Sequence, residues 1–155
     1  MYLAVVLLFM LILPAGSVAL EMWAANPIPL MLALGKWFVF WGVGARLASA
    51  GLRQYFQPAF TAKHIFHMES AEALPLVREL GVSNFAIGIV ALASLWWSDF
   101  RLPLAIIAAI FYGIAGIRHV LETGKSRNET IAMISDLFIA IVLAAYAVAV
   151  MGKLT

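Results

Sequence analysis

The chain of 155 residues has no cysteine and few charged residues. Without cysteine, the protein cannot use disulfides, thiolate catalysis, iron-sulfur ligation or cysteine-based zinc sites. Asp, Glu, Lys and Arg together account for only 12% of the residues, so the charged surface of an ordinary soluble domain is missing. The formal net charge is +2 and there is no basic tract. Nucleic-acid binding is therefore not expected.

Most of the remaining residues are apolar. Apolar residues make up 65% of the chain, and the mean hydropathy is +1.00. At about 20 residues per bilayer crossing, 155 residues hold four or five transmembrane helices and no further domain. The composition therefore predicts an all-α polytopic membrane bundle, with residues 1–155 as a single transmembrane domain. We expect it to be integral to the cell (inner) membrane, with the lipid bilayer as its first partner.

Five apolar segments are long enough to cross the bilayer. They predict transmembrane helices at about residues 2–20, 29–56, 71–97, 102–123 and 129–151. A cleaved signal peptide is the alternative for the first segment, but the basic residues that precede such a peptide's apolar run are missing. We therefore expect a mature helix there.

Local signals add detail to these helices. Pro14 and Gly16 predict a kink in the first helix. Residues 126–129 read SRNE, and this S-x-x-E spacing predicts a capping box at the start of the last helix. Residues 58–70 mix aromatic side chains with lysine and histidine, which is typical of a segment lying at the membrane interface.

The basic residues predict an orientation. With five crossings, the connections after the second and fourth helices lie on the same side as the N-terminus. Five basic residues lie in or beside those connections and three lie on the other side: Arg53, Lys63, Arg118, Lys125 and Arg127 against Lys36, Arg101 and Lys153. The positive-inside rule then predicts a cytoplasmic N-terminus and an outside C-terminus.

Ionisable residues crowd towards one end of the predicted bundle, where charge inside a membrane is costly. Arg46 lies about 15 Å in from the end of the second helix, and Asp136 about 10 Å into the last. Arg46 and Arg53 are seven residues apart and therefore share a helix face. We expect a polar pocket on the cytoplasmic side, lined by Arg46, Arg53, Arg78, Glu79, Asn84, Tyr112, His119 and Asp136.

Several interpretations of this polar layer stay open. In the first interpretation, the charged side chains pair with one another and only fix the helix register, which is a structural role. Alternatively, they would line a cavity for an anionic or amphiphilic ligand, or a proton path. Binding of a larger partner through the same polar face is the remaining alternative.

Histidine and carboxylate residues on the same side raise a metal hypothesis. The candidate ligands are His64, His67, Glu69, His119 and Glu122. Their spacing permits nitrogen and oxygen ligation without specifying it, so a metal is not the favoured cofactor. Only His119 falls within a spanning helix, which argues against a bis-histidine haem. No nucleophile motif is visible, so enzymatic activity is not favoured either.

Longer segments resemble known families. Residues 44–58 (GARLASAGLRQYFQP) resemble the first-helix signature of the DoxX-like small membrane proteins, in which an arginine is followed by glycine-spaced apolar residues and a polar end. Residues 77–95 (VRELGVSNFAIGIVALASL), 110–120 (IFYGIAGIRHV) and 129–139 (ETIAMISDLFI) resemble an uncharacterised prokaryotic family of small integral membrane proteins. The resemblance covers roughly residues 36–150. It implies a four-helix core made of the second to fifth helices, with the N-terminal helix added.

The resemblance also bears on function. DoxX-like proteins are associated with quinone-linked or thiol-stress functions, and this chain departs from them in its lack of cysteine and its extra helix. Our leading hypothesis is a non-enzymatic module that binds a small amphiphile or supports a larger membrane complex. The first alternative is a small transporter or proton-coupled carrier, expected as a homo-oligomer, in which Arg46, Glu79 and Asp136 exchange partners. The second is a quinone-linked membrane oxidoreductase subunit with Tyr112 and His119 near the head group. A quinone or a lipid is thus the candidate ligand.

Overall fold

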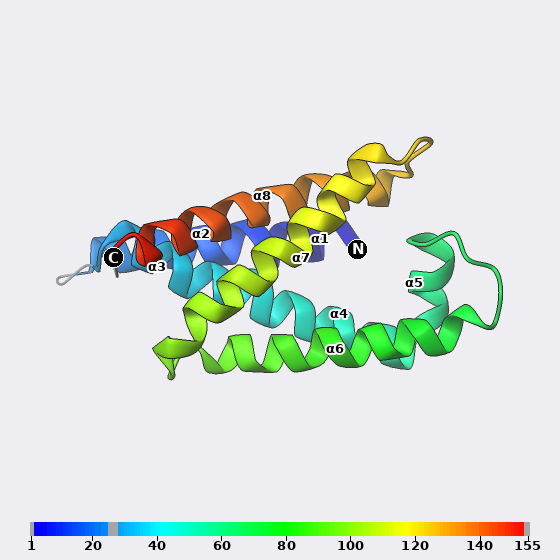
Figure 1. Ribbon diagram of the computed structural model, residues 1–155, viewed down its shortest axis with the longest axis horizontal. Helices are drawn as coiled ribbons and strands as arrows, with labels where there is room; N and C mark the ends of the chain where they lie inside the picture. Colours follow the sequence, from blue (N-terminus) through cyan, green and yellow to red (C-terminus); the bar gives the residue numbers. More distant parts are fainter. Residues whose placement is uncertain (1, 25–27, 154–155) are drawn as a thin grey trace.

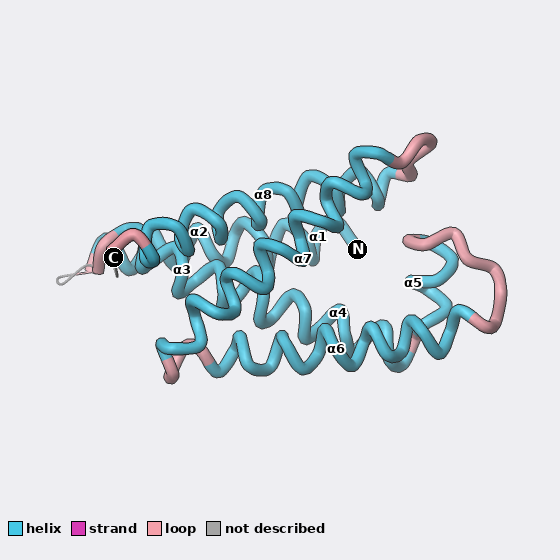
Figure 2. The backbone as a smooth tube through the Cα atoms, in the orientation of Figure 1, coloured by secondary structure: helices cyan, strands magenta, loops and turns pink. Residues whose placement is uncertain are grey.

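The computed structural model describes residues 2–24 and 28–153, and these residues form helices and turns with no strand (Figures 1 and 2). In this described part, five helices are long and apolar enough to cross a membrane: Leu3–Trp23, Leu30–Phe56, Ala73–Ala93, Ser98–Leu121 and Arg127–Met151. The predicted fold class, an all-α membrane bundle with five spans, is confirmed. The third helix is a few residues shorter than predicted at both ends, because turns occupy its flanks.

The first spanning helix is made of α1 (Tyr2–Leu7), a π-helical segment (Leu8–Ile12) and α2 (Leu13–Trp23). Pro14 has no N–H and its ring crowds the carbonyl four residues earlier. The chain accommodates this with the π-helical segment, in which the Leu13 N–H donates to the Leu8 carbonyl oxygen. The irregularity predicted at Pro14 therefore lies just before it. Val6, Met10 and Val18 are buried in the main core, so this helix packs on the bundle.

The second spanning helix is central. It consists of α3 (Leu30–Trp37), a π-helical segment (Phe38–Ala45) and α4 (Arg46–Phe56). It contacts the first helix on one side, and α6, α7 and α8 on others. Its buried core residues pack with Ile139 and Leu143 of α8, and they include Phe38, Val39, Val43 and Leu47.

The short helix α5 (Pro58–His64) lies in the segment predicted to be interfacial, and α6 (Ala73–Ala93) follows it. Glycines bring α6 and α4 into close contact. A Cβ added to Gly81 would lie 2.9 Å from the Gly51 carbonyl oxygen, and one added to Gly88 would lie 2.9 Å from that of Gly44. Such small residues let helix backbones approach closely. The face of α6 that carries Gly81 and Gly88 therefore points inward, against α4.

The last two spans are α7 (Arg101–Leu121), preceded by a 3₁₀ turn (Ser98–Phe100), and α8 (Arg127–Met151). They pack along each other, whereas α6 lies apart from them and beside α4 (Figure 1). The predicted capping box is confirmed at the start of α8. The Ser126 hydroxyl accepts the Glu129 N–H at 3.2 Å, and the Glu129 carboxylate accepts the Ser126 N–H at 2.7 Å.

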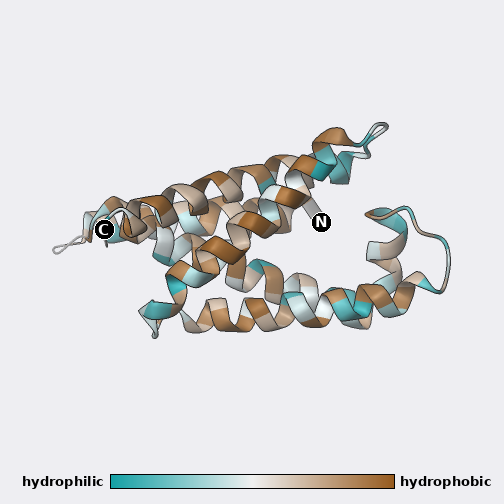
Figure 3. Ribbon diagram, in the orientation of Figure 1, coloured by the Kyte–Doolittle hydropathy of each residue, from teal (hydrophilic) through white to brown (hydrophobic). Residues whose placement is uncertain are grey.

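The bundle has two unlike ends. We call the α5 end the one that holds α5 and the turn at residues 122–126, and the opposite end the one that holds the end of α2 and the turn at residues 94–100. Figure 3 shows hydrophilic residues at both ends and along the half of α6 nearest to α5. The start of α1 lies towards the α5 end (Figure 1).

Candidate functional site

A cavity of about 280 Å³ lies at the α5 end, between the first helix, α4 and α5. Its polar lining residues are Arg46, Ser49, Arg53, Gln54 and Thr61, and its apolar ones are Val5, Ala50, Phe60, Ile65 and Phe66. The charged residues in this described lining are the two arginines. The cavity therefore has a cationic polar side and an apolar side.

The arginines reach the cavity because of their spacing on α4. Arg46, Ser49 and Arg53 follow one another at intervals of three and four residues and therefore share a face. Around the helix from them, Leu47 and Gly51 are buried. The guanidinium carbon of Arg53 lies 3.6 Å from the centroid of the Phe60 ring, a cation-π contact that joins α4 to α5. The face predicted from sequence thus forms one wall of the cavity.

Arg46 also interacts electrostatically with the carboxyl group of Asp136 on α8. Asp136 is half-buried and is not among the lining residues. Arg46 and Asp136 are therefore near enough for their charges to interact across the second and last helices. Arg46 is compatible with both the structural and the ligand-binding interpretation of the polar layer, because it interacts with a carboxylate and also borders a cavity.

Asn84 contributes to the site indirectly. Its side chain is 4% exposed, and its Nδ2 donates to Oε1 of Gln54 at 2.8 Å. This bond joins α6 to α4 and holds a side chain that lines the cavity. Gln54 was not among the residues predicted from sequence, although it directly follows Arg53 in the chain.

The structure does not bring Arg78 and Glu79 into this layer. Both side chains are exposed, so the inward position expected for them is wrong. The reason is angular: Val77 is buried, and each following residue lies about 100° further around the helix. Arg78 is one step from Val77 and lies beside the buried face, and Glu79 is two steps from it and lies on the outer face.

Tyr112 is buried at 4% exposure, and its hydroxyl donates to the Gly42 carbonyl oxygen at 3.0 Å. It links α7 to the π-helical segment of the second helix, and it lies outside the cavity lining. The structure therefore places Tyr112 in the core between helices.

A second hollow runs between α6 and α7. This groove has a volume of about 600 Å³. Its lining consists of Phe66, Leu80, Ile107, Ile110, Phe111, Ile114, Ala115, Arg118 and His119. Phe66 lines both the groove and the cationic cavity, and the guanidinium carbon of Arg118 lies 5.8 Å from its ring centroid. The groove is therefore apolar along its walls and basic at the α5 end.

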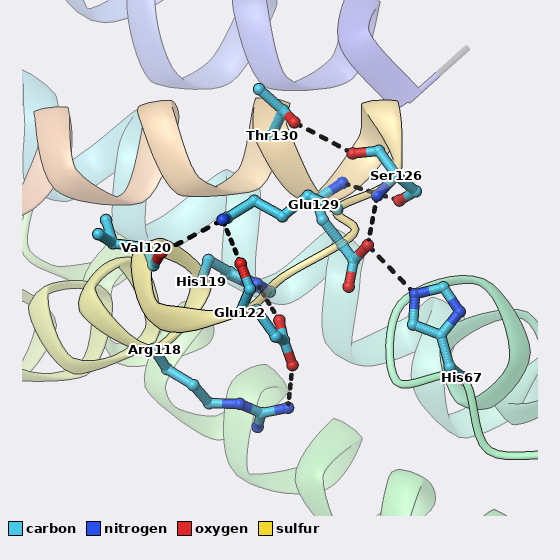
Figure 4. A network of polar contacts seen from close by, with 9 residues as sticks. His67, Arg118, His119, Val120, Glu122, Ser126, Glu129 and Thr130 are labelled. Carbon is cyan, nitrogen blue, oxygen red and sulfur yellow. Dashed lines mark hydrogen bonds and ion pairs between the residues drawn. The ribbon is translucent and has the colours of Figure 1, made fainter.

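The side chains of His67, His119, Glu122 and Glu129 form a cluster at the α5 end (Figure 4), and His119 also lines the groove. Nδ1 of His119 is 3.2 Å from Oε2 of Glu122, and Nε2 of His67 is 3.1 Å from Oε2 of Glu129. One potential ligand atom each from His119, Glu122 and Glu129 lies within 4.8 Å of the others.

The cluster contains three of the five residues predicted as metal-ligand candidates, namely His67, His119 and Glu122. His64 packs against the Phe60 ring, and Glu69 lies exposed in the connection after α5. Glu129 was missed, because the capping box accounted for it. Its position just beyond the turn that follows His119 and Glu122 was the signal that could have found it.

The sequence matches the family described as "Family of unknown function (DUF6790)" over residues 2–152, so the chain belongs to this family. No curated protein and no solved structure is significantly similar to it. The prediction of an uncharacterised family is confirmed, whereas a DoxX-like relationship is not shown.

Proposed function

We propose that this member of a family of unknown function is a non-enzymatic membrane module that binds the anionic head group of a small amphiphile. The binding site is the cavity between the first helix, α4 and α5. The observation that carries the proposal is its lining, in which the charged groups of the described residues are the guanidinium groups of Arg46 and Arg53. Two cations facing one space favour an anion there.

The polar lining suits a phosphate or a carboxylate. Each guanidinium offers a planar set of N–H donors that matches the oxygens of such groups. Ser49, Gln54 and Thr61 add hydroxyl and amide donors. About 280 Å³ is close to the lower end of the range for small-molecule sites, so the cavity has room for a head group.

The apolar lining supports an amphiphile over a free anion. Phe60, Ile65 and Phe66 border the cavity opposite its cations. Beyond Phe66, the groove between α6 and α7 adds about 600 Å³ beside mostly apolar side chains. A bound alkyl chain would bury apolar surface there, which is favourable.

The cavity is proposed to face the cytoplasm. Arg53, Lys63, Arg118, Lys125 and Arg127 lie in or next to the connections at the α5 end, and basic residues are retained on the cytoplasmic side.

The alternative functions gain less support from the geometry. A carrier in which Glu79 exchanges partners with Arg46 needs Glu79 inside the bundle, but its side chain is exposed on α6. A quinone head group near Tyr112 would compete with the bond that its hydroxyl donates to Gly42. The amphiphile site has neither difficulty.

Native mass spectrometry of the detergent-purified protein tests the proposal. Equal amounts of phosphatidylglycerol and phosphatidylcholine are added, so that the two lipids differ in head-group charge. We expect preferential adducts of the anionic lipid. Arg53→Gln should reduce them about tenfold, since a charge-assisted contact contributes about 1.4 kcal/mol or more.

Arg78→Gln is the matched control, because it removes the same charge from an exposed position of α6 outside the cavity. Equal binding of both lipids by the unchanged protein, or equal loss in the two variants, would overturn the proposal.

A further inference from the structure

We propose that His67, His119, Glu122 and Glu129 form a binding site for a divalent transition-metal ion of the zinc class. The site goes beyond the proposed amphiphile binding and uses none of the residues that line the cationic cavity. The metal would join the connection after α5 to the end of α7 and the start of α8 (Figure 4).

The spacing of the ligand atoms supports the site. Neighbouring ligands of a tetrahedral zinc ion, with bonds of about 2.1 Å, lie about 3.4 Å apart. The His119–Glu122 and His67–Glu129 pairs are separated by 3.2 and 3.1 Å. The two pairs come together because atoms of His119, Glu122 and Glu129 all lie within 4.8 Å of one another. His67 joins this group through its contact with Glu129.

The donor chemistry selects the class of ion. Two imidazole nitrogens with two carboxylate oxygens suit zinc and its first-row neighbours. Magnesium and calcium prefer oxygen ligands throughout, so the histidines argue against them. Without cysteine, the chain offers no thiolate that would compete for the metal.

Local structure holds each ligand in place. His119 lies in the last turn of α7, and Glu122 directly follows that helix in an extended conformation. Glu129 is held in the first turn of α8 by the capping box. His67 has a φ of 53°, a left-handed backbone conformation that is uncommon for a residue with a side chain. Three separate segments therefore converge on one point.

Burial divides the ligands into an inner and an outer pair. The side chains of Glu129 and His119 are only 3% and 10% exposed, whereas those of Glu122 and His67 are 38% and 60% exposed. The inner pair provides a preformed base for the ion, and the outer pair faces the route by which it arrives. This arrangement also makes the outer pair safe to replace without opening the core.

Neighbouring cations leave the carboxylates accessible. Arg118 contacts Oε1 of Glu122 at 3.5 Å, whereas His119 contacts Oε2 of the same carboxylate. The Lys125 amine donates to the carbonyl oxygens of Val120 and Glu122, so it caps the end of α7 and does not contact a cluster carboxylate in these bonds.

Cobalt binding tests the site, because tetrahedral Co²⁺ gives visible absorption bands and replaces Zn²⁺ in such sites. The full chain in detergent, freed of any histidine tag, is titrated with Co²⁺ and then with Zn²⁺. We expect one Co²⁺ per chain, visible bands, and their loss on adding Zn²⁺. His67→Ala and Glu122→Gln should each weaken binding at least tenfold.

His64→Ala and Glu69→Gln are the matched controls, since they remove the same residue types from the same region outside the cluster. Both should bind Co²⁺ as the unchanged protein does. Arg53→Gln should also keep the metal, so failure of the amphiphile proposal and failure of this one are distinguishable.

A second measurement separates loss of a ligand from loss of the fold. A given Zn²⁺ concentration should raise the melting temperature of the unchanged protein more than that of Glu122→Gln, while both proteins unfold at similar temperatures in chelator. Absence of stoichiometric Co²⁺ and Zn²⁺ binding would overturn the proposal and identify the cluster as ion pairs alone. Equal metal affinity in the unchanged protein and both ligand variants would overturn it as well.

Discussion

The two ends of the bundle use similar residue types in different ways. At the opposite end, Lys36 contacts Glu21 at 2.6 Å, and the Trp37 indole N–H donates to the same carboxylate. Arg101 donates to the carbonyl oxygen of Ser94 at 3.0 Å. At the α5 end, Arg46 and Arg53 border a cavity instead. Charged side chains therefore have a structural role where neighbouring groups contact them. They form a candidate binding site where a cavity lies beside them.

The helix arrangement explains the difference. At the opposite end, α2 and α3 lie side by side, so the carboxylate of one reaches the amine of the other. Towards the α5 end, α6 follows α4 and diverges from the α7–α8 pair (Figure 1). The short helix α5 covers part of the space that opens.

The largest effect is expected for Arg46→Ala. It leaves the half-buried Asp136 carboxyl without the interacting charge, which should lower the free energy of unfolding by about 3 kcal/mol. Steric trapping or thermal unfolding in detergent, followed by tryptophan fluorescence, measures the loss. Adding Asp136→Asn should restore most of it. An unchanged stability of the single variant would show that the charges are not coupled.

The next effect concerns the contact that positions α4 against α6. A Cβ on Gly51 would lie 2.5 Å from the Gly81 carbonyl oxygen and 2.9 Å from the Phe85 Cα. Gly51→Ala should therefore lower the free energy of unfolding by about 2 kcal/mol, measured by the same unfolding experiment.

Gly113→Ala is its control, because the nearest atom, the Ala140 Cβ, is 3.8 Å away. That variant should be neutral or slightly stabilising. Equal losses of unfolding free energy in the two variants would mean that the close contact between α4 and α6 at Gly51 is not the cause of the loss.

The smallest effect separates the two ends directly. Lys36→Gln removes the amine that contacts Glu21 and should cost about 1 kcal/mol of unfolding free energy, with phosphatidylglycerol binding unchanged. Arg53→Gln should show the reverse pattern, with weaker lipid binding and little change in stability. Thermal unfolding and native mass spectrometry on both variants check this, and the contrast between the ends fails if both variants lose the same property.

Much of the fold was predictable from the sequence. The five spans followed from apolar runs, since the thickness of the bilayer sets their length. The capping box at Ser126 followed from local spacing, because both of its hydrogen bonds lie within four residues. The π-helical segment at Phe38–Ala45 was not foreseen, because it belongs to a run that looks helical throughout.

The site was predictable only in part. The seven-residue spacing correctly placed Arg46 and Arg53 on one face. Arg78 and Glu79 were misplaced, because depth along a helix says nothing of direction around it. Gln54 and Glu129 were missed, since their roles depend on partners 30 and 62 residues away, Asn84 and His67.

The sequence by itself determined that this protein is an all-helical membrane bundle with its charge gathered near one end, because hydropathy and helix spacing act locally along the chain. Only the tertiary structure decided which charges face a cavity, which face outward, and which histidines and carboxylates meet. Those outcomes depend on how far α6 diverges from the α7–α8 pair and on where the connection after α5 returns. Helix packing sets both, through contacts between residues distant in the chain.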